Sequence, residues 1–196
     1  MTRLFLVTAI AVVSSALGAA QTLSGEALVK ALQQGGYVIV MRHTSSPGAV
    51  PDKATANPDN TKPERQLDEE GRTTATAMGK AFRDLKIHIG EVLSSPTYRA
   101  LETVKYAQFG TAIPTPELGD NGQSMAGGTA AQAEWLQKRV LQTPKGTNTL
   151  MVTHTPNLRG AFPAQTGVAD GEALIFAPRA TLVARIKIEE WEKLAK

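Results

Sequence analysis

The 196-residue chain has no cysteine, only three histidines, and 5% aromatic residues. Without cysteine it forms no disulfides and no thiolate metal sites, and it has no lipid-attached leader of the kind that requires a cysteine. It also lacks an excess of one charge, since 21 lysines and arginines face 18 aspartates and glutamates. No basic run with interleaved aromatics occurs, so we expect no nucleic-acid partner. The hydrophobic fraction of 42% is that of a globular protein, whose core must hold the fold unaided.

Long apolar runs are also scarce, and the most extended one stands at the N-terminus. Arg3 precedes an almost unbroken apolar run at residues 4–17, and small residues and Gln21 follow it. This pattern is typical of a secretory signal peptide. A retained membrane anchor is the alternative, but the run is short for a membrane span. We therefore expect a signal peptide at residues 1–20, a single domain at residues 21–196, and a periplasmic or secreted protein with no membrane span in its mature form.

Strand and helix patterns alternate along the rest of the chain. Continuous apolar, β-branched runs indicate buried strands, and apolar residues at helical spacing indicate the helices between them. The alternation predicts an α/β fold, a three-layer α/β/α sandwich with a mostly parallel central sheet. The expected strands are 37–41, 92–93, 113, 148–153, 173–176 and 181–188, and the expected helices are 25–34, 68–85, 95–107, 130–141 and one from 155.

Three of these strands end in polar side chains. The first runs into Arg42 and His43, the second into Ser95 with Arg99 on the following helix, and a late one into His154. The carboxyl ends of parallel strands form the ligand-binding edge of such a sheet. Two arginines and two histidines at one edge would repel one another unless an anion joins them. Phosphate fits, because guanidinium groups match its oxygens bidentately and helix N-termini add N–H donors.

The motifs "VIVMRHTSSP", "ERQLDEEGR", "VLSSPTYRALETVKYA" and "MVTHTPNL" together resemble the histidine phosphatase superfamily, which has the phosphoglycerate-mutase-like fold. The later segments "GTNTLMVTHTPNLRGAF" and "DGEALIFAP" are similar to its small exported bacterial members. The resemblance implies that His43 is the nucleophile that accepts the phosphoryl group. It also implies that Arg42, Arg99 and His154 form the phosphate pocket. No metal or other cofactor is expected, and the third histidine, His88, has no ligand partner at a useful spacing.

The sequence departs from the family pattern directly after the nucleophile. Thr44 stands where the family usually has glycine, so Thr44 and Ser45 become candidate phosphate ligands. Arg65 ends a long polar loop at residues 44–65 and is a candidate for the pocket entrance. Loops of this length in a compact domain are commonly functional.

The general acid is left open among three carboxylates. Asp120 and Glu117 lie in "PELGDNG", near where many relatives carry a glutamate. Glu172 is favoured, because it directly precedes an apolar strand that should run beside the site. Without an acid, poor leaving groups would be protonated inefficiently, and substrates with good leaving groups would be preferred.

The leading hypothesis is an exported phosphatase that acts on a small phosphorylated substrate, or on a phosphorylated envelope component, through phospho-His43. A non-catalytic phospholigand-binding module with the same pocket is one alternative. A phosphomutase is another, although such enzymes carry longer chains with additional insertions.

Overall fold

The computed structural model describes residues 22–120 and 129–196. The expected signal peptide lies outside these residues, as does most of the glycine-rich loop that follows Asp120. Within the described ranges, no helix has the length and apolar character needed to cross a membrane.

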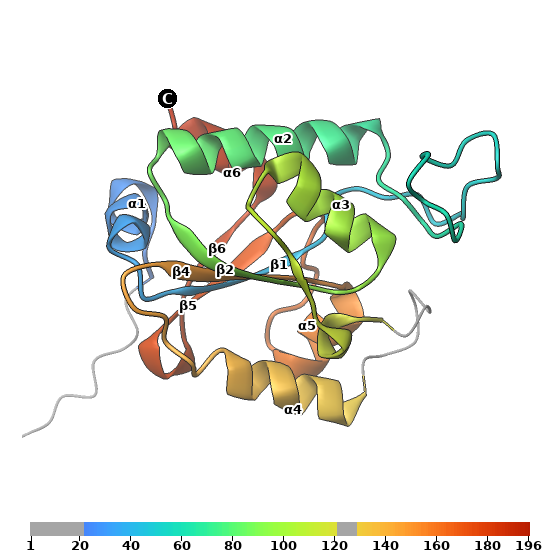
Figure 1. Cartoon of the computed structure of the whole chain (residues 1–196). Helices are drawn as coiled ribbons and strands as arrows, with labels where there is room; N and C mark the ends of the chain where they lie inside the picture. Colours follow the sequence, from blue (N-terminus) through green and yellow to red (C-terminus); the bar gives the residue numbers. More distant parts are fainter. Residues whose placement is uncertain (1–21, 121–128) are drawn as a thin grey trace, which may run out of the picture.

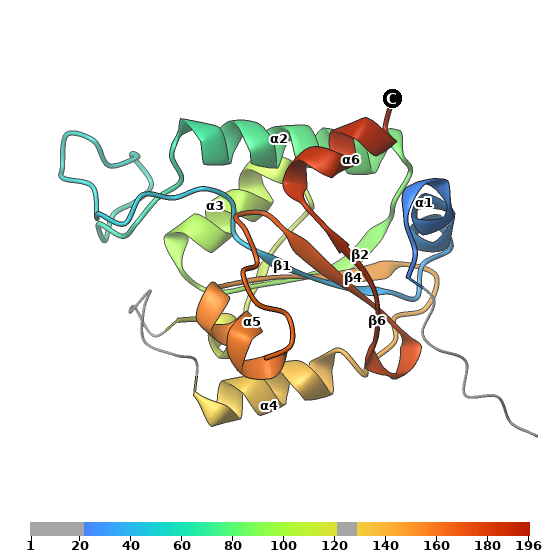
Figure 2. The ribbon, with the colours of Figure 1, turned by 180° about the vertical axis from the view of Figure 1, so that it is seen from behind.

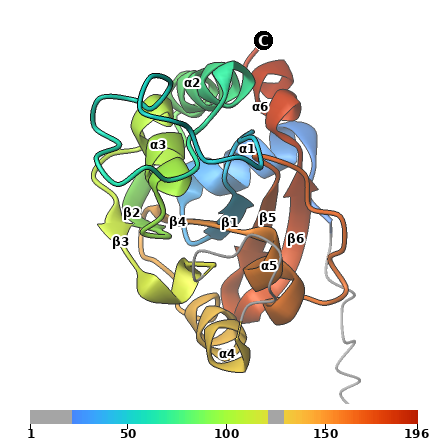
Figure 3. The ribbon, with the colours of Figure 1, turned by 90° about the vertical axis from the view of Figure 1, so that its right-hand side faces the viewer.

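A six-stranded sheet in the order β3-β2-β4-β1-β5-β6 forms the centre of the molecule (Figure 3). The pairs β2–β3, β2–β4 and β1–β4 are parallel, whereas β5 runs antiparallel to both β1 and β6. Every strand except β5 therefore points the same way, and the expected mostly parallel sheet is confirmed. The strands are β1 (Val38–Arg42), β2 (Ile89–Ser94), β3 (Ile113–Pro114), β4 (Asn148–Thr153), β5 (Ala173–Ala177) and β6 (Thr181–Ile186).

Helices cover both faces of the sheet, so the three-layer sandwich is confirmed (Figures 1 and 2). Side chains of β1 alternate between the layers: Ile39 and Met41 join one apolar cluster, and Val38 and Val40 join the other. One face carries α1 (Gly25–Gln34), α2 (Glu69–Asp84), α3 (Tyr98–Ala107) and α6 (Ile188–Leu194). The other face carries α4 (Ala130–Arg139) and α5 (Thr155–Ala161). The described residues also form two 3-10 turns, η1 (Pro116–Leu118) and η2 (Pro178–Ala180).

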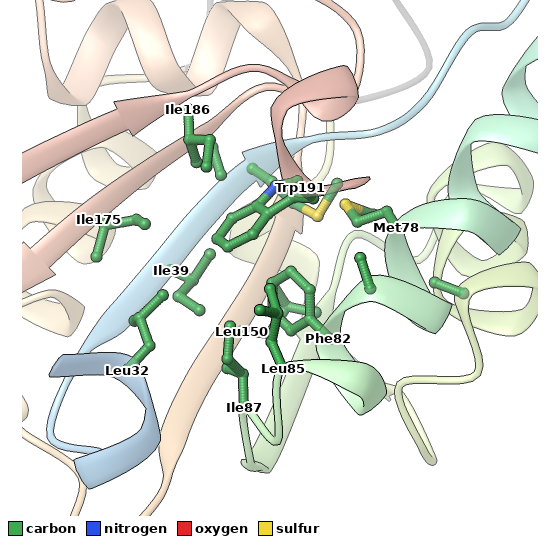
Figure 4. Packing of buried hydrophobic residues seen from close by; sticks show 14 of the residues in the cluster. Leu32, Ile39, Met78, Phe82, Leu85, Ile87, Leu150, Ile175, Ile186 and Trp191 are labelled. Atoms are coloured by element: carbon green, nitrogen blue, oxygen red, sulfur yellow. The ribbon is translucent and has the colours of Figure 1, made fainter. Parts of the chain in front are cut away.

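The last strand is shorter than the sequence predicts, because a helix replaces its end. β6 stops at Ile186, and α6 begins at Ile188. The carboxylate of Glu190 accepts a hydrogen bond from the backbone N–H of Lys187 at 2.7 Å, which starts the helix. α6 then buries Trp191 completely, with its ring centroid 4.5 Å from that of Phe82 (Figure 4). The core on this face therefore depends on the C-terminal helix.

The loop between β1 and α2 is fixed against α3. The buried carboxylate of Glu102 on α3 accepts hydrogen bonds from Leu67 N and from Asn57 Nδ2, both at 2.7 Å. Burial raises the pKa of Glu102. At the end of the loop, Asp68 caps α2 by accepting from Gly71 N at 2.8 Å. The loop is therefore a defined wall at the edge where β1, β2 and β4 end.

Candidate active site

A cavity of about 400 Å³ opens at this edge of the sheet. It lies at the carboxyl ends of β1 and β4 and at the start of α3, and it brings together the four residues expected to form the phosphate pocket. Its charged and titratable lining consists of Arg42, His43, Arg65, Arg99, Asp120, His154 and Arg159.

His43 is fixed through its backbone and its ring. Its N–H donates to Thr153 O at 3.0 Å, which continues the β1–β4 pairing. Its ring Nδ1 lies 2.7 Å from Thr44 O, and Arg99 Nε lies 3.2 Å from its Nε2. A carbonyl only accepts and a guanidinium only donates, so Nδ1 carries the proton and Nε2 carries the lone pair. The nitrogen suited to nucleophilic attack is therefore held next to Arg99.

His154 has the opposite tautomer. Arg99 Nη2 lies 3.2 Å from its Nδ1, so this nitrogen accepts and Nε2 carries the proton. Nε2 lies 2.8 Å from Ser95 Oγ and 3.3 Å from Thr97 Oγ1, at the start of α3. The two imidazoles are 5.1 Å apart between centroids and meet edge to face at 61°. One guanidinium therefore orients both rings.

The surroundings of both imidazoles favour the neutral form. Burial, followed by the neighbouring His154 and by Arg99 and Arg42, holds the pKa of His43 well below its usual range, although the Thr44 carbonyl opposes this shift. Burial and then Arg99, Arg65 and Arg42 lower the pKa of His154 to about 3. A bound anion would act in the opposite direction and raise both pKa values.

Carboxylates orient Arg42 and Arg99. Asp120, 3% exposed, forms an ion pair with Arg99, and Asp120 Oδ2 also lies 3.9 Å from His154 Nδ1. Arg42 is paired with Asp170 at 2.7 Å. These contacts fix the guanidiniums before any ligand arrives, which lowers the reorganisation that binding requires.

Thr44 and Ser45, the expected phosphate ligands, are not among the residues that line the cavity. Thr44 is fully buried, its N–H donates to Thr103 Oγ1 at 3.2 Å, and the two hydroxyls lie 3.3 Å apart. Thr103 in turn donates to Arg99 O at 2.9 Å. The hydroxyl of Ser45 donates to Asp68 Oδ2 at 2.7 Å, at the cap of α2. Thr44 thus contacts the nucleophile and not the cavity: its backbone carbonyl accepts the hydrogen bond from His43 Nδ1–H.

Glu172, the favoured candidate for the general acid, does not line the cavity either. Its carboxylate accepts from Arg185 Nε at 2.5 Å and from Ala169 N at 2.7 Å. Burial alone would raise the pKa of Glu172, but these bonds together outweigh it and lower the pKa. Glu117 lies on η1, is half-buried, and does not line the cavity. Among the described residues, Asp120 is the carboxylate that lines it.

Three residues of the site were not expected from the sequence. Arg159 lines the cavity from α5, five residues after His154, and the spacing in "HTPNLR" is the signal that indicates it. Asp170 and Thr103 act through Arg42 and Thr44, and such tertiary pairings carry no sequence signal. In the part of the chain that the structure describes, no group of three or more histidine or acidic side chains is arranged to hold a metal ion.

Comparisons with known proteins agree with this geometry. The sequence model of the histidine phosphatase superfamily (branch 1) matches residues 38–120, which include Arg42, His43 and Arg99 and end before His154. A search of curated proteins found no match.

Solved structures share the fold at low sequence identity. The putative phosphohistidine phosphatase SixA from Agrobacterium tumefaciens has 16% identity and a TM-score of 0.55, with 78% of this chain and 98% of that chain covered. The protein histidine phosphatase SixA complexed with tungstate has 18% identity and a TM-score of 0.55, covering 79% and 98%. The protein TTHB049 from Thermus thermophilus has 17% identity and a TM-score of 0.51, covering 76% and 98%. The chain thus shares its fold with these structures, and its residues 38–120 match the histidine phosphatase superfamily model.

Proposed function

We propose that the protein hydrolyses a phosphorylated substrate through a covalent phosphohistidine on His43, without a metal ion. The match of residues 38–120 to the superfamily model supports a phosphatase-type activity. The observation that carries the finer proposal is the fixed tautomer of His43, whose Nδ1–H is bound to Thr44 O at 2.7 Å while Nε2 faces Arg99.

The reaction follows from the positions of these groups. The Nε2 lone pair of His43 attacks phosphorus, the bond from phosphorus to the leaving group breaks, and the leaving group departs with the bonding electron pair. Arg42, Arg99 and His154 bind the oxygens of the phosphoryl group in transit. The Thr44 carbonyl stabilises the positive charge that develops on the imidazole. Water then attacks phosphorus, the P–N bond breaks, and inorganic phosphate leaves.

The carboxylates of the site favour substrates with good leaving groups. Asp120 is engaged by Arg99 and Glu172 by Arg185, so neither is arranged to give a proton to a departing alkoxide. We therefore propose aryl phosphates or phosphoramidates as substrates, and phosphohistidine is the phosphoramidate in the name of the SixA protein from Agrobacterium tumefaciens. This preference is tested by comparing kcat/KM for phenyl phosphate, an alkyl phosphate and phosphoramidate. Equal rates for aryl and alkyl phosphates would contradict it and indicate a working general acid.

The covalent step is tested with p-nitrophenyl phosphate in the presence of a chelator. The wild-type protein is expected to turn over, and an alkaline quench followed by mass spectrometry should locate phosphate on His43. His43→Ala should abolish both signals. His88→Ala is the matched control, because His88 is exposed and lies outside the cavity. Wild-type activity no greater than that of His43→Ala across a broad pH range would favour the alternative, a non-catalytic phospholigand-binding module.

We also propose that the protein is exported to the periplasm or secreted, where it acts on a phosphorylated envelope component or another small phosphorylated substrate. Arg3 followed by the apolar run at residues 4–17 supports the proposal. Cell fractionation followed by N-terminal sequencing tests it: a mature chain that begins near Gln21 in the exported fraction is the expected result. A full-length chain in the cytoplasm would contradict it.

A further inference from the structure

Arg65 and Arg159 line the mouth of the cavity, and Arg42 and Arg99, the inner pair, line its deeper part. The side chain of Arg99 is 5% exposed and that of Arg42 is 28% exposed, whereas Arg65 is half-buried and Arg159 is exposed. All four line the same cavity of about 400 Å³, so they form a series from its floor to its opening. A phosphoryl group on His43 Nε2 lies against Arg99, whose Nε is 3.2 Å from that atom. The outer part of the cavity is left for the remainder of the substrate.

Arg65 is held in place by neutral groups. Its Nε donates to Pro47 O at 2.7 Å and its Nη2 donates to Ser46 O at 3.1 Å. Both acceptors belong to the loop that Glu102 fixes against α3. The guanidinium is therefore oriented without being neutralised.

Arg159 comes from the other wall, on α5. In the described part of the chain, no carboxylate forms an ion pair with Arg159 or with Arg65. The inner arginines differ, because Arg99 pairs with Asp120 and Arg42 with Asp170. Among the described residues, the cations at the mouth thus have no direct ion pair with a carboxylate, and Asp120 and Asp170 act on Arg65 only at longer range.

This arrangement is unfavourable in the absence of ligand. Burial and the repulsion of Arg99 lower the pKa of Arg65, so its charge is held at a cost. Guanidiniums without a direct ion pair on two walls of one cavity are suited to bind carboxylate or phosphate, whose oxygens they match bidentately.

We infer that Arg65 and Arg159 form a second anion subsite at the mouth, and that preferred substrates carry a carboxylate or a second phosphate beside the transferred phosphoryl group. The inference rests on the proposed function for the identity of the first group. It adds the class of substrate: a phosphorylated compound with a second anionic group within reach of the mouth.

Binding of non-hydrolysable phosphonates tests the subsite without requiring turnover. Isothermal titration compares phenylphosphonate with 4-phosphonobenzoate, which adds only a carboxylate, and with 1,4-benzenediphosphonate, which adds a second phosphonate. We expect the wild type to bind the doubly anionic ligands about tenfold more tightly than phenylphosphonate, as one charge-assisted contact allows. The carboxylate and phosphonate arms show which anion the subsite prefers.

Variants of the two mouth arginines complete the test. Arg159→Gln and Arg65→Gln should each reduce the affinity ratio to about two or less, and Arg159→Glu should bring it below one. Arg179→Gln removes one positive charge from an exposed arginine outside the cavity and should keep the wild-type ratio. Because Arg159 is exposed, its variants are expected to fold, and thermal unfolding checks this for Arg65→Gln.

The outcomes separate this inference from the proposed function. A wild-type ratio near one, or an unchanged ratio in Arg159→Gln, overturns the subsite even if aryl phosphates are hydrolysed. A ratio that depends on both arginines in a protein with no turnover supports the subsite and overturns the phosphatase proposal. Failure of the wild type to bind any of the phosphonates overturns both.

Discussion

His43 and His154 occupy equivalent places and have different environments. Each follows a buried parallel strand, each is almost fully buried, and each accepts one hydrogen bond from Arg99. The proton of His43 is bound to a backbone carbonyl, Thr44 O, whereas that of His154 faces the hydroxyls of Ser95 and Thr97. A carbonyl accepts only, but a hydroxyl both donates and accepts.

This difference assigns the roles of the two rings. A carbonyl fixes one tautomer and stabilises the positive charge that an attacking imidazole acquires. In His154, Nε2 already carries a proton that the hydroxyls accept, so a second proton binds at Nδ1, which lies 3.9 Å from Asp120 Oδ2. That carboxylate and a bound anion both favour the cationic ring. His43 is therefore suited to be the nucleophile, and His154 is suited to become a cationic ligand of the phosphoryl group.

The largest expected effect separates the two rings directly. His43→Gln should lower kcat on p-nitrophenyl phosphate by about 10⁴-fold or more and leave no phosphoenzyme. His154→Gln should lower kcat by about 10²-fold and still form phospho-His43, because it removes a ligand of the transition state. Quench-flow with mass spectrometry measures both quantities. Equal losses in the two variants, or phosphate trapped on His154, would contradict the assignment.

Arg99→Lys should produce the next largest effect. Lysine keeps the charge but loses the fork that reaches both rings, so kcat should fall by about 10²–10³-fold. The ¹⁵N imidazole shifts should show that His43 keeps its tautomer, because Thr44 O still accepts Nδ1–H. His154 should become a mixture of tautomers, because only hydroxyls then orient it. A mixed tautomer at His43 would show that Arg99, and not the carbonyl, fixes the nucleophile.

The sequence was sufficient to predict the layers, the parallel sheet and the convergence of Arg42, His43, Arg99 and His154. These predictions rest on where strands end, and strand ends are a local property of the hydrophobic pattern. The C-terminal helix was missed, because the alternating apolar pattern of β6 continues to Ile188, which is the first residue of α6.

Side-chain direction could not be predicted from the same pattern. Thr44 looked like a phosphate ligand because of its place in the sequence, but Thr103 on α3 takes its hydroxyl and N–H. Glu172 does precede a strand at the correct edge, yet the antiparallel neighbour β6 places Arg185 against it. In both cases a residue distant in sequence decides which groups remain for a ligand.

A smaller effect is expected from Thr103, which supports the environment of His43 through Thr44. Thr103→Val should lower kcat by about tenfold, because a displaced Thr44 carbonyl misaligns the nucleophile. It should also destabilise the fold by about 1–3 kcal/mol, since the buried N–H of Thr44 loses its acceptor. Thr76→Val on α2 is the matched control, because its hydroxyl donates to Arg72 O one turn back at 2.8 Å but is exposed.

The pH profile of kcat separates the two roles that Thr103 can have. A purely structural residue would change stability and leave kcat and its pH profile unchanged. If Thr103 positions His43, the acid limb of the kcat profile should move together with the tenfold loss, because the environment of the imidazole has changed.

The smallest effect is the coupling between pH and anion binding. Both histidine pKa values are lowered in the folded protein, that of His154 to about 3. Below the unfolded value of about 6.5, the unfolded chain binds protons that the folded protein does not, so the free energy of unfolding falls as pH falls.

A bound anion raises the pKa of His154 and offsets this loss. The gain in Tm from saturating sulfate, whose charge is constant in this range, should therefore grow between about pH 7.5 and pH 5. His154→Gln should reduce this growth by a larger amount than His88→Gln, because His154 is the ring arranged to take up a proton with the anion. A sulfate effect that is independent of pH would contradict proton uptake by His154 and indicate that both rings stay neutral when an anion binds.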